Sequence, residues 1–322
     1  MSLTLKDIEA AAERIRGRAV RTPLLEAHAA SAQTGARVFV KAEVLQRTGS
    51  FKFRGAMSRM TLLDAGERKR GVVAYSSGNH AQAVACAARD LGSSAVIVMP
   101  TDAPKLKIEN TKGYGAEVVL YDRFAQDRVA IGKKIAQERG LTLVPPFDDY
   151  RIIAGQGTAG LEIAQDAKAG GLTFDAVLVP CSGGGLTAGI ASALAELSPQ
   201  TKVYGVEPEH FDDTARSLAA GKRVANTATT PSICDALMTE MPGELTFPII
   251  QRIVKALSVT DDEALRAMAH AFYNLKLVAE PGGAAAFAAL LSGKLDVRGK
   301  TVAVVLSGGN VDAEMFRSAL AS

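Results

Sequence analysis

The chain has 322 residues, of which 48% are apolar and 22% charged, and its formal net charge is +3. This length suits one large α/β domain or two lobes, and the composition is ordinary for a soluble globular protein. The absence of tryptophan and of any long Lys/Arg run argues against nucleic-acid binding. Three widely spaced cysteines (Cys86, Cys181 and Cys234) form neither a disulfide framework nor a metal quartet, which indicates a reducing compartment.

Nothing in the sequence predicts a membrane segment. The first residues include Lys6 and Asp7 and contain no apolar signal core. Residues 176–195 are uncharged and long enough to span a bilayer, but Pro180 and a triple glycine interrupt them. A strand, a loop and a helix therefore fit this stretch better. We expect a cytoplasmic protein with no membrane partner.

Short apolar runs alternate with segments of helical periodicity along the chain. A first helix is predicted over residues 3–17, where apolar residues recur on one face and Gly17 marks the stop. Strands are predicted, in chain order, at residues 38–40, 72–75, 95–99, 117–121, 141–144, 176–179, 202–206 and 301–306. This alternation predicts an α/β fold of two lobes, with open, twisted, mostly parallel sheets and helices on both faces.

Four of these strands, from residue 72 to residue 144, come at regular spacing and predict a compact smaller lobe. We expect this lobe at residues 67–148, inserted into a larger lobe formed by residues 1–66 and 149–322. Open α/β sheets bind ligands beyond the carboxyl ends of their strands. The loops at those ends are Ser76-Ser77-Gly78-Asn79-His80, Ser182-Gly183-Gly184-Gly185-Leu186, Glu207-Pro208 and Ser307-Gly308-Gly309-Asn310.

Lys52 lies between Phe51 and Phe53, just before a glycine-alanine step. A lysine in an apolar pocket loses solvation, so its pKa falls and its amine becomes a nucleophile or a base. These are the properties of a lysine that forms a Schiff base with a carbonyl cofactor.

The turn at residues 182–185 leads into a predicted helix and suits a phosphate, because glycine N–H groups and a helix N-terminus attract anions. A rival interpretation is a dinucleotide fingerprint formed by Gly183, Gly185 and Ala188, with Glu207 at the next strand end. A plain structural turn is the third alternative.

The other loops also have both structural and functional interpretations. Residues 77–80 form a helix N-cap or bind a carboxylate, and for His80 alone a structural role is favoured. Ser307 lies in a tight turn or beside a ligand. Glu207, Asp212 and Asp213 belong to a solvated acidic loop or hold a hard cation.

Together the motifs resemble those of fold-type II pyridoxal-phosphate enzymes, which share the tryptophan synthase β fold. The most similar branch contains threonine dehydratase, serine racemase and hydroxyaspartate dehydratase. The resemblance covers nearly the whole chain, in order. It matches Ser50-Phe51-Lys52 to the cofactor lysine, residues 76–80 to the substrate-carboxylate loop, residues 183–186 to the phosphate loop and residues 307–310 to the segment facing the pyridine nitrogen.

The resemblance implies a role for each matched residue. Lys52 would carry the cofactor, Phe51 would pack near its ring, and Asn79 would bond its phenolic oxygen. Ser307 would meet the pyridine nitrogen. Ser77 would stand on the opposite ring face, where racemases place a second proton carrier.

The same resemblance matches Glu207, the carbonyl of Phe211 and Asp213 to the divalent-cation site (Mg²⁺ or Mn²⁺) of serine racemase. It also places Arg128 near the substrate end, where this arginine could meet a second carboxylate; Arg54 and His210 are weaker candidates. Relatives commonly have glycine in place of Ala236. The family suggests a homodimer.

The implied activity is a pyridoxal-phosphate dependent dehydratase, or ammonia-lyase. Such an enzyme eliminates water from threonine, serine or 3-hydroxyaspartate, with a slight preference here for threonine-type dehydration. The alternatives are a racemase of the serine racemase type, a β-replacement enzyme, a non-catalytic cofactor-binding protein of the same fold, and a nicotinamide-dependent oxidoreductase built on the dinucleotide pattern.

Overall fold

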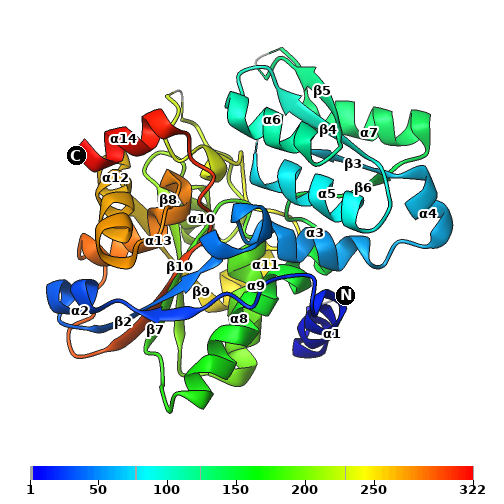
Figure 1. Cartoon of the computed structure of the whole chain (residues 1–322). Coiled ribbons are helices and arrows are strands. Elements are labelled where there is room, and N and C mark those ends of the chain that lie inside the picture. The colour runs from blue at the N-terminus through cyan, green and yellow to red at the C-terminus, as the bar shows by residue number, and fades with distance from the viewer. Residues whose placement is uncertain (1–2, 77, 124, 229, 322) are drawn as a thin grey trace.

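The computed structural model describes residues 3–76, 78–123, 125–228 and 230–321, and its strands form two separate sheets (Figure 1). The larger sheet has the spatial order β1 (Leu24–Glu26), β2 (Arg37–Ala42), β10 (Thr301–Leu306), β7 (Ala176–Pro180), β8 (Lys202–Pro208) and β9 (Val254–Val259). The smaller sheet has the order β5 (Glu117–Tyr121), β4 (Ala95–Pro100), β3 (Val72–Tyr75) and β6 (Thr142–Leu143). Every pair of neighbouring strands is parallel except β1 and β2.

Helices connect the strands and cover the sheets. Those of the first half are α1 (Leu5–Ile15), α2 (His28–Thr34), α3 (Lys52–Met60), α4 (Ala65–Arg70), α5 (Asn79–Asp90), α6 (Lys105–Gly113) and α7 (Arg128–Arg139). Those of the second half are α8 (Tyr150–Ala169), α9 (Gly185–Leu197), α10 (Asp213–Ala220), α11 (Phe247–Ile253), α12 (Asp261–His270), α13 (Pro281–Leu291) and α14 (Ala313–Ala321). Short helical turns add η1 (Glu43–Leu45), η2 (Arg47–Gly49), η3 (Asp235–Leu237) and η4 (Ala271–Leu275).

Successive residues of the larger sheet enter two different cores, because side chains alternate between the faces of a strand. Val302, Val304 and Leu306 of β10 pack with α12 and α13 on one face. Ala303 and Val305 pack with α8 and α9 on the other face. Both faces are covered, so β10 is apolar from Val302 to Leu306.

The smaller sheet is built in the same way. Val72 and Ala74 of β3 share a core with α3 and α5, whereas Val73 packs with residues of α7. All four strands lie inside the segment 67–148 that the sequence assigns to the smaller lobe, and the boundaries themselves stay a prediction. This lobe forms the upper right of Figure 1.

The α/β fold with parallel sheets is confirmed, and all eight predicted strands are present. The uncharged stretch 176–195 forms β7, a loop and most of α9, as expected. Across the described part of the chain, no helix combines the length and the apolar character that a membrane span requires. Two strands were missed: β1 has three half-buried residues, and β9 is an edge strand whose only buried residues are Val254 and Val259.

Candidate active site

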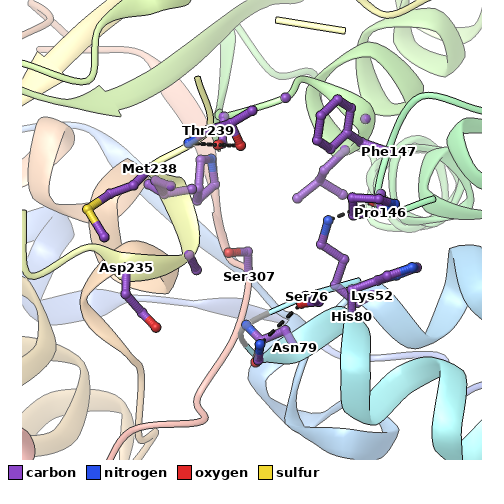
Figure 2. Close-up of a pocket in the computed structure, with 18 of the residues that line it drawn as sticks. Lys52, Ser76, Asn79, His80, Pro146, Phe147, Asp235, Met238, Thr239 and Ser307 are labelled. Atoms are coloured by element: carbon purple, nitrogen blue, oxygen red, sulfur yellow. Dashed lines mark hydrogen bonds between the residues drawn. The ribbon is translucent and has the colours of Figure 1, made fainter. Parts of the chain in front are cut away.

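One pocket gathers three of the four loops at the carboxyl ends of the strands. Its lining includes the loops that follow β3, β7 and β10, together with Phe51, Lys52 and Arg128. Residues far apart in the sequence therefore face one space, with Lys52 on one side and Ser307 across from it (Figure 2).

Lys52 is the first residue of α3, and its side chain extends into the pocket. Its Nζ atom donates a hydrogen bond to the carbonyl oxygen of Pro146 at 2.8 Å and lies 5.1 Å from the centroid of the Phe51 ring. No carboxylate of the described residues neutralises it, so burial lowers the pKa of Lys52 to about 8. The neutral, nucleophilic form of this amine is therefore far more populated near physiological pH than that of an ordinary lysine.

The turn 183–185 leaves no room for side chains. A Cβ atom on Gly183 would lie 2.5 Å from Cδ1 of Phe147, and one on Gly184 would lie 2.5 Å from Cδ1 of Ile250. Gly184 also has a φ of +89°, a conformation that favours glycine. Helix α9 begins at Gly185 and contributes the positive end of its dipole, so the loop has the features of an anion-binding site, with the side chains of Phe147 and Ile250 packed against it.

The loop after β3 leads into α5 and is held by its own side chains. Ser76 accepts a hydrogen bond from the Gly78 amide at 3.1 Å (Figure 2). Asn79 donates to Glu280 and accepts from the amide of Asn310 at 2.8 Å, which fixes the orientation of its side chain. Ser77 lies outside the described residues, so its predicted role is untested.

His80 is buried in the wall of the same pocket. Its Nε2 lies 2.9 Å from the carbonyl oxygen of Val144, which assigns the imidazole proton to that nitrogen. Burial, together with the nearby Lys52 ammonium, lowers the pKa of His80 to about 3. The ring is therefore neutral, and its Nδ1 has no hydrogen-bond partner among the described residues.

Ser307 is tied to the lysine motif through the backbone. Its carbonyl accepts a hydrogen bond from the Phe51 amide at 3.0 Å, and Ser50 and Gly308 form an isolated antiparallel bridge. The Ser307 amide donates to the carbonyl of Gly283 at 3.1 Å. This geometry brings the predicted cofactor lysine and the predicted pyridine partner to one place.

Sequence reasoning missed three charged residues of the pocket: Lys107, Asp235 and Glu280. Lys107 Nζ lies 2.8 Å from Asp235 Oδ2 and 3.4 Å from Glu280 Oε2. Burial alone would lower the pKa of Lys107, but the two carboxylates hold it above its ordinary value. Two signals were available: Glu280 precedes Pro281-Gly282-Gly283 at the start of a helix, and Asp235 adjoins Ala236, whose segment the family resemblance places beside the cofactor.

Arg128 lines the pocket at the start of α7, with its guanidinium carbon 5.9 Å from the centroid of the Tyr75 ring. No carboxylate of the described residues forms an ion pair with it. The two weaker candidates were wrong. Arg54 is fully buried against Glu43 and Glu162, away from the pocket, and His210 lines a different surface depression.

Glu207 and Asp213 do not form a solvated acidic loop, because both are fully buried. Glu207 accepts hydrogen bonds from the amides of Thr214 at 2.9 Å and Ala215 at 3.0 Å. Burial raises the pKa of Glu207 to about 8, helped by the nearby Asp213, and burial raises the pKa of Asp213 to about 7. Asp213 Oδ2 is buried without a partner among the described atoms.

These two carboxylates suit a hard cation, which would compensate their burial and engage the free oxygen of Asp213. Within the described ranges, no group of three or more His, Cys, Asp and Glu side chains could hold a metal ion. A cation here would thus need main-chain oxygen and water as further ligands. The carbonyl of Phe211 stays a prediction for this role.

Comparison with known proteins identifies the family. Residues 15–308 match the family model described as "Pyridoxal-phosphate dependent enzyme". The chain belongs to the pyridoxal-phosphate dependent enzyme family. An L-threo-3-hydroxyaspartate ammonia-lyase of Pseudomonas sp is 46% identical over 98% of this chain and 97% of its own length. A serine racemase of Schizosaccharomyces pombe is 40% identical over 97% of this chain and 96% of its own.

A solved threonine deaminase, that of T.th., has the same fold. It superposes with a TM-score of 0.90 at 45% identity, covering 96% of this chain and 99% of its own. The family match favours a phosphate-containing cofactor over a dinucleotide, and the role of the glycine turn as its phosphate cradle stays a prediction. The residues present fit this cofactor: the pocket contains an amine of lowered pKa and an anion cradle that side chains would fill.

Proposed function

We propose that this chain is an ammonia-lyase that dehydrates a β-hydroxy-α-amino acid and releases a 2-oxo acid and ammonia. The names of its relatives support this activity: the L-threo-3-hydroxyaspartate ammonia-lyase of Pseudomonas sp and, at 41% identity over 98% of this chain, an L-threonine ammonia-lyase of Thermotoga maritima. The pocket contributes an amine that can take up a proton at Lys52 Nζ.

We further propose that the substrate is a 3-hydroxyaspartate rather than threonine. One observation carries this choice: Arg128 faces the pocket without a carboxylate partner among the described residues. A second carboxylate on the substrate would satisfy this guanidinium in bidentate geometry. The methyl group of threonine would leave the guanidinium without a partner.

Pyridoxal phosphate, when bound, supplies an aldehyde for the substrate amine and a ring that accepts electrons from Cα. Lys52 would act as the base that takes the Cα proton at Nζ, and its lowered pKa gives this amine a larger neutral fraction than an ordinary lysine has. The backbone amides of Gly183, Gly184 and Gly185 hold the phosphate, with Leu186 continuing the first turn of α9 behind them.

The remaining residues orient the two molecules. Ser76, Gly78 and the N-terminus of α5 bind the substrate's α-carboxylate, next to Asn79 and His80. Asn79 would donate from its amide nitrogen to the cofactor's phenolic oxygen, since its own oxygen is occupied by Asn310. Ser307 and Phe51 line the same pocket, where Ser307 would offer its hydroxyl to the ring nitrogen and Phe51 would pack near the ring. The predicted role of Ser77 as a second proton carrier stays part of this proposal.

The test is a substrate panel run on the purified holoenzyme. Threo and erythro isomers of L- and D-3-hydroxyaspartate are compared with threonine and serine, scoring ammonia and 2-oxo acid. We expect oxaloacetate and ammonia in equal amounts, with the highest kcat/KM for one hydroxyaspartate isomer. Turnover of threonine or serine with the higher kcat/KM would overturn the substrate assignment, and no ammonia from any member would overturn the activity.

Racemisation is the second candidate, because serine racemases occur among the relatives. Chiral analysis of the remaining amino acid in the same panel measures it directly. The products distinguish the two activities, since racemisation releases no ammonia.

We also propose a cytoplasmic homodimer that binds a divalent cation at Glu207 and Asp213. Cys86, Cys181 and Cys234 are buried and free, which suits a reducing compartment. Exposed apolar side chains, including Tyr273 and Val278, suit burial by a second copy. Light scattering is expected to give twice the 33.7 kDa of one chain.

A further inference from the structure

Asn226 connects the acidic pair to the rim of the cofactor pocket. Its Nδ2 group donates two hydrogen bonds in different directions. One reaches Asp213 Oδ1 at 2.6 Å, and the other reaches the carbonyl oxygen of Thr239 at 2.7 Å. A single amide group therefore contacts both a proposed cation ligand and a residue that lines the pocket.

Thr239 in turn contacts the start of the glycine turn. The Ser182 hydroxyl donates to Thr239 Oγ1 at 2.5 Å, and the Thr239 amide donates to Ser182 Oγ at 3.3 Å (Figure 2). Ser182 directly precedes Gly183, whose carbonyl accepts a hydrogen bond from the Gly243 amide at 3.2 Å. The segment that carries Thr239 thus supports the phosphate cradle from outside.

The orientation of the Asn226 amide is fixed by its third partner. Arg216 Nη2 donates to Asn226 Oδ1 at 2.8 Å, and the Asn226 backbone amide donates to the carbonyl of Glu240 at 2.7 Å. Rotating the amide by half a turn would point its oxygen at two acceptors and its NH₂ at a guanidinium. Only one orientation satisfies all partners, so the position of Asp213 and the position of Thr239 are not independent.

We propose that Asn226 couples cation binding at Glu207 and Asp213 to cofactor binding at the glycine turn. A divalent cation fixes Asp213, Asn226 transmits this position to Thr239, and Ser182 then holds the phosphate cradle in its binding geometry. Because coupling between two binding sites is reciprocal, the cofactor tightens cation binding by the same factor. This inference rests on the proposed cation site but not on the proposed substrate.

The test measures cofactor affinity rather than activity. The dissociation constant of pyridoxal phosphate is determined for the holoenzyme by equilibrium dialysis, once with Mg²⁺ and once with a chelator. In the unaltered protein, Mg²⁺ is expected to tighten cofactor binding at least about fivefold. In Asn226→Ala this ratio is expected to fall to about one, while a calorimetric titration with Mg²⁺ still detects binding at the acidic pair.

Two further variants keep the result interpretable. Thr227→Ala removes an exposed side chain next to Asn226 and should retain the full ratio. Thr239→Val keeps the main-chain carbonyl that Asn226 contacts but removes the hydroxyl bonded to Ser182, so it should also lose the coupling, even where Asn226→Ala does not fold.

Each outcome decides a different point. The proposal is overturned if Mg²⁺ still tightens cofactor binding in Asn226→Ala as much as in the unaltered protein. If only Thr239→Val folds, the same result in that variant overturns it. If the unaltered protein binds Mg²⁺ but its cofactor affinity does not change, the coupling is overturned and the cation site is supported. Absence of Mg²⁺ binding overturns both. Failure of the substrate panel would leave this measurement unaffected.

Discussion

Lys107 and Asp235 join the two sides of the active-site pocket, with Nζ of the lysine 2.8 Å from Oδ2 of the aspartate. Lys107 belongs to α6 beside the smaller sheet, and Asp235 begins η3 of the larger lobe. The lysine stem lies against the loop after β3, since a Cβ on Gly78 would stand 2.8 Å from Lys107 Cδ. The ion pair therefore links the two lobes directly beside the proposed carboxylate-binding loop.

Lys107→Met should destabilise the protein far more than Asp235→Asn. The first change leaves Glu280, which is 1% exposed, buried without its cation, at a cost of about 3–5 kcal/mol. The second change removes a partner whose side chain is 32% exposed and should cost at most about 1 kcal/mol. Urea denaturation measures both. The double variant Lys107→Met with Glu280→Gln should recover most of the loss, and equal losses in the two single variants would contradict this account.

Covalent attachment of pyridoxal phosphate to the cofactor-free protein should depend on pH with a midpoint near 8. Burial lowers the pKa of Lys52 to about 8, and only the neutral amine attacks the aldehyde. The attachment rate should rise as the pH increases through 8 and then level off, whereas an ordinary lysine would continue to gain up to about pH 10. Stopped-flow absorbance gives the rate, with Lys52→Arg as the variant that cannot react. A rate still rising tenfold per pH unit above 9 would refute the burial argument.

Gly184→Ala should abolish tight cofactor binding. The new methyl group would meet Ile250 and Thr246 behind the cradle, and the left-handed backbone would add about 1–2 kcal/mol of strain. Gly17→Ala is the matched control, because Gly17 also has a positive φ but nothing lies within 4 Å of its added Cβ. Cofactor content after gel filtration should be near zero in the first variant and normal in the second. Equal cofactor content in both would show that crowding at the cradle is unimportant.

Arg128→Gln should change substrate preference rather than overall activity. Loss of a charged hydrogen-bond partner for the second carboxylate is worth about 1.5–3 kcal/mol, or about 10- to 100-fold in kcat/KM for 3-hydroxyaspartate. The kcat/KM for threonine should change by less than about threefold, since its methyl group makes no such contact. Arg139→Gln, at the other end of α7 and paired with Glu117, serves as the control. A parallel loss for both substrates would remove Arg128 from the specificity assignment.

The sequence predicted those residues of the pocket whose neighbours in the chain already indicate a special role. Lys52, the glycine turn and Ser307 were found because each lies where a strand ends or in an unusual local setting, and the fold brings them to one pocket. Lys107 and Glu280 were missed because their meaning depends on a contact between residues 173 positions apart. The sequence around Lys107 does not indicate that two carboxylates from distant segments will contact it.

Arg54 shows that a residue close to the site in sequence can lie outside it in the structure. It was a weaker candidate for the second substrate carboxylate, but side chains two positions apart in a helix point to different faces. The guanidinium instead enters the core, where it meets Glu43 and Glu162. Helix α3 is thus anchored by a buried ion network on one side and presents the reactive amine on the other.

The backbone ladder between the segments of Ser50-Phe51 and Ser307-Gly308 also has a dynamic consequence. Because main-chain hydrogen bonds join these two stretches, the amine and the hydroxyl that face each other across the cofactor pocket move as one rigid unit. The contacts that join the two lobes at Lys107 are separate from this ladder, since they run through side chains to Asp235 and Glu280. Loss of the Lys107 ion pairs would therefore leave the main-chain connection between the Lys52 and Ser307 sides of the pocket in place.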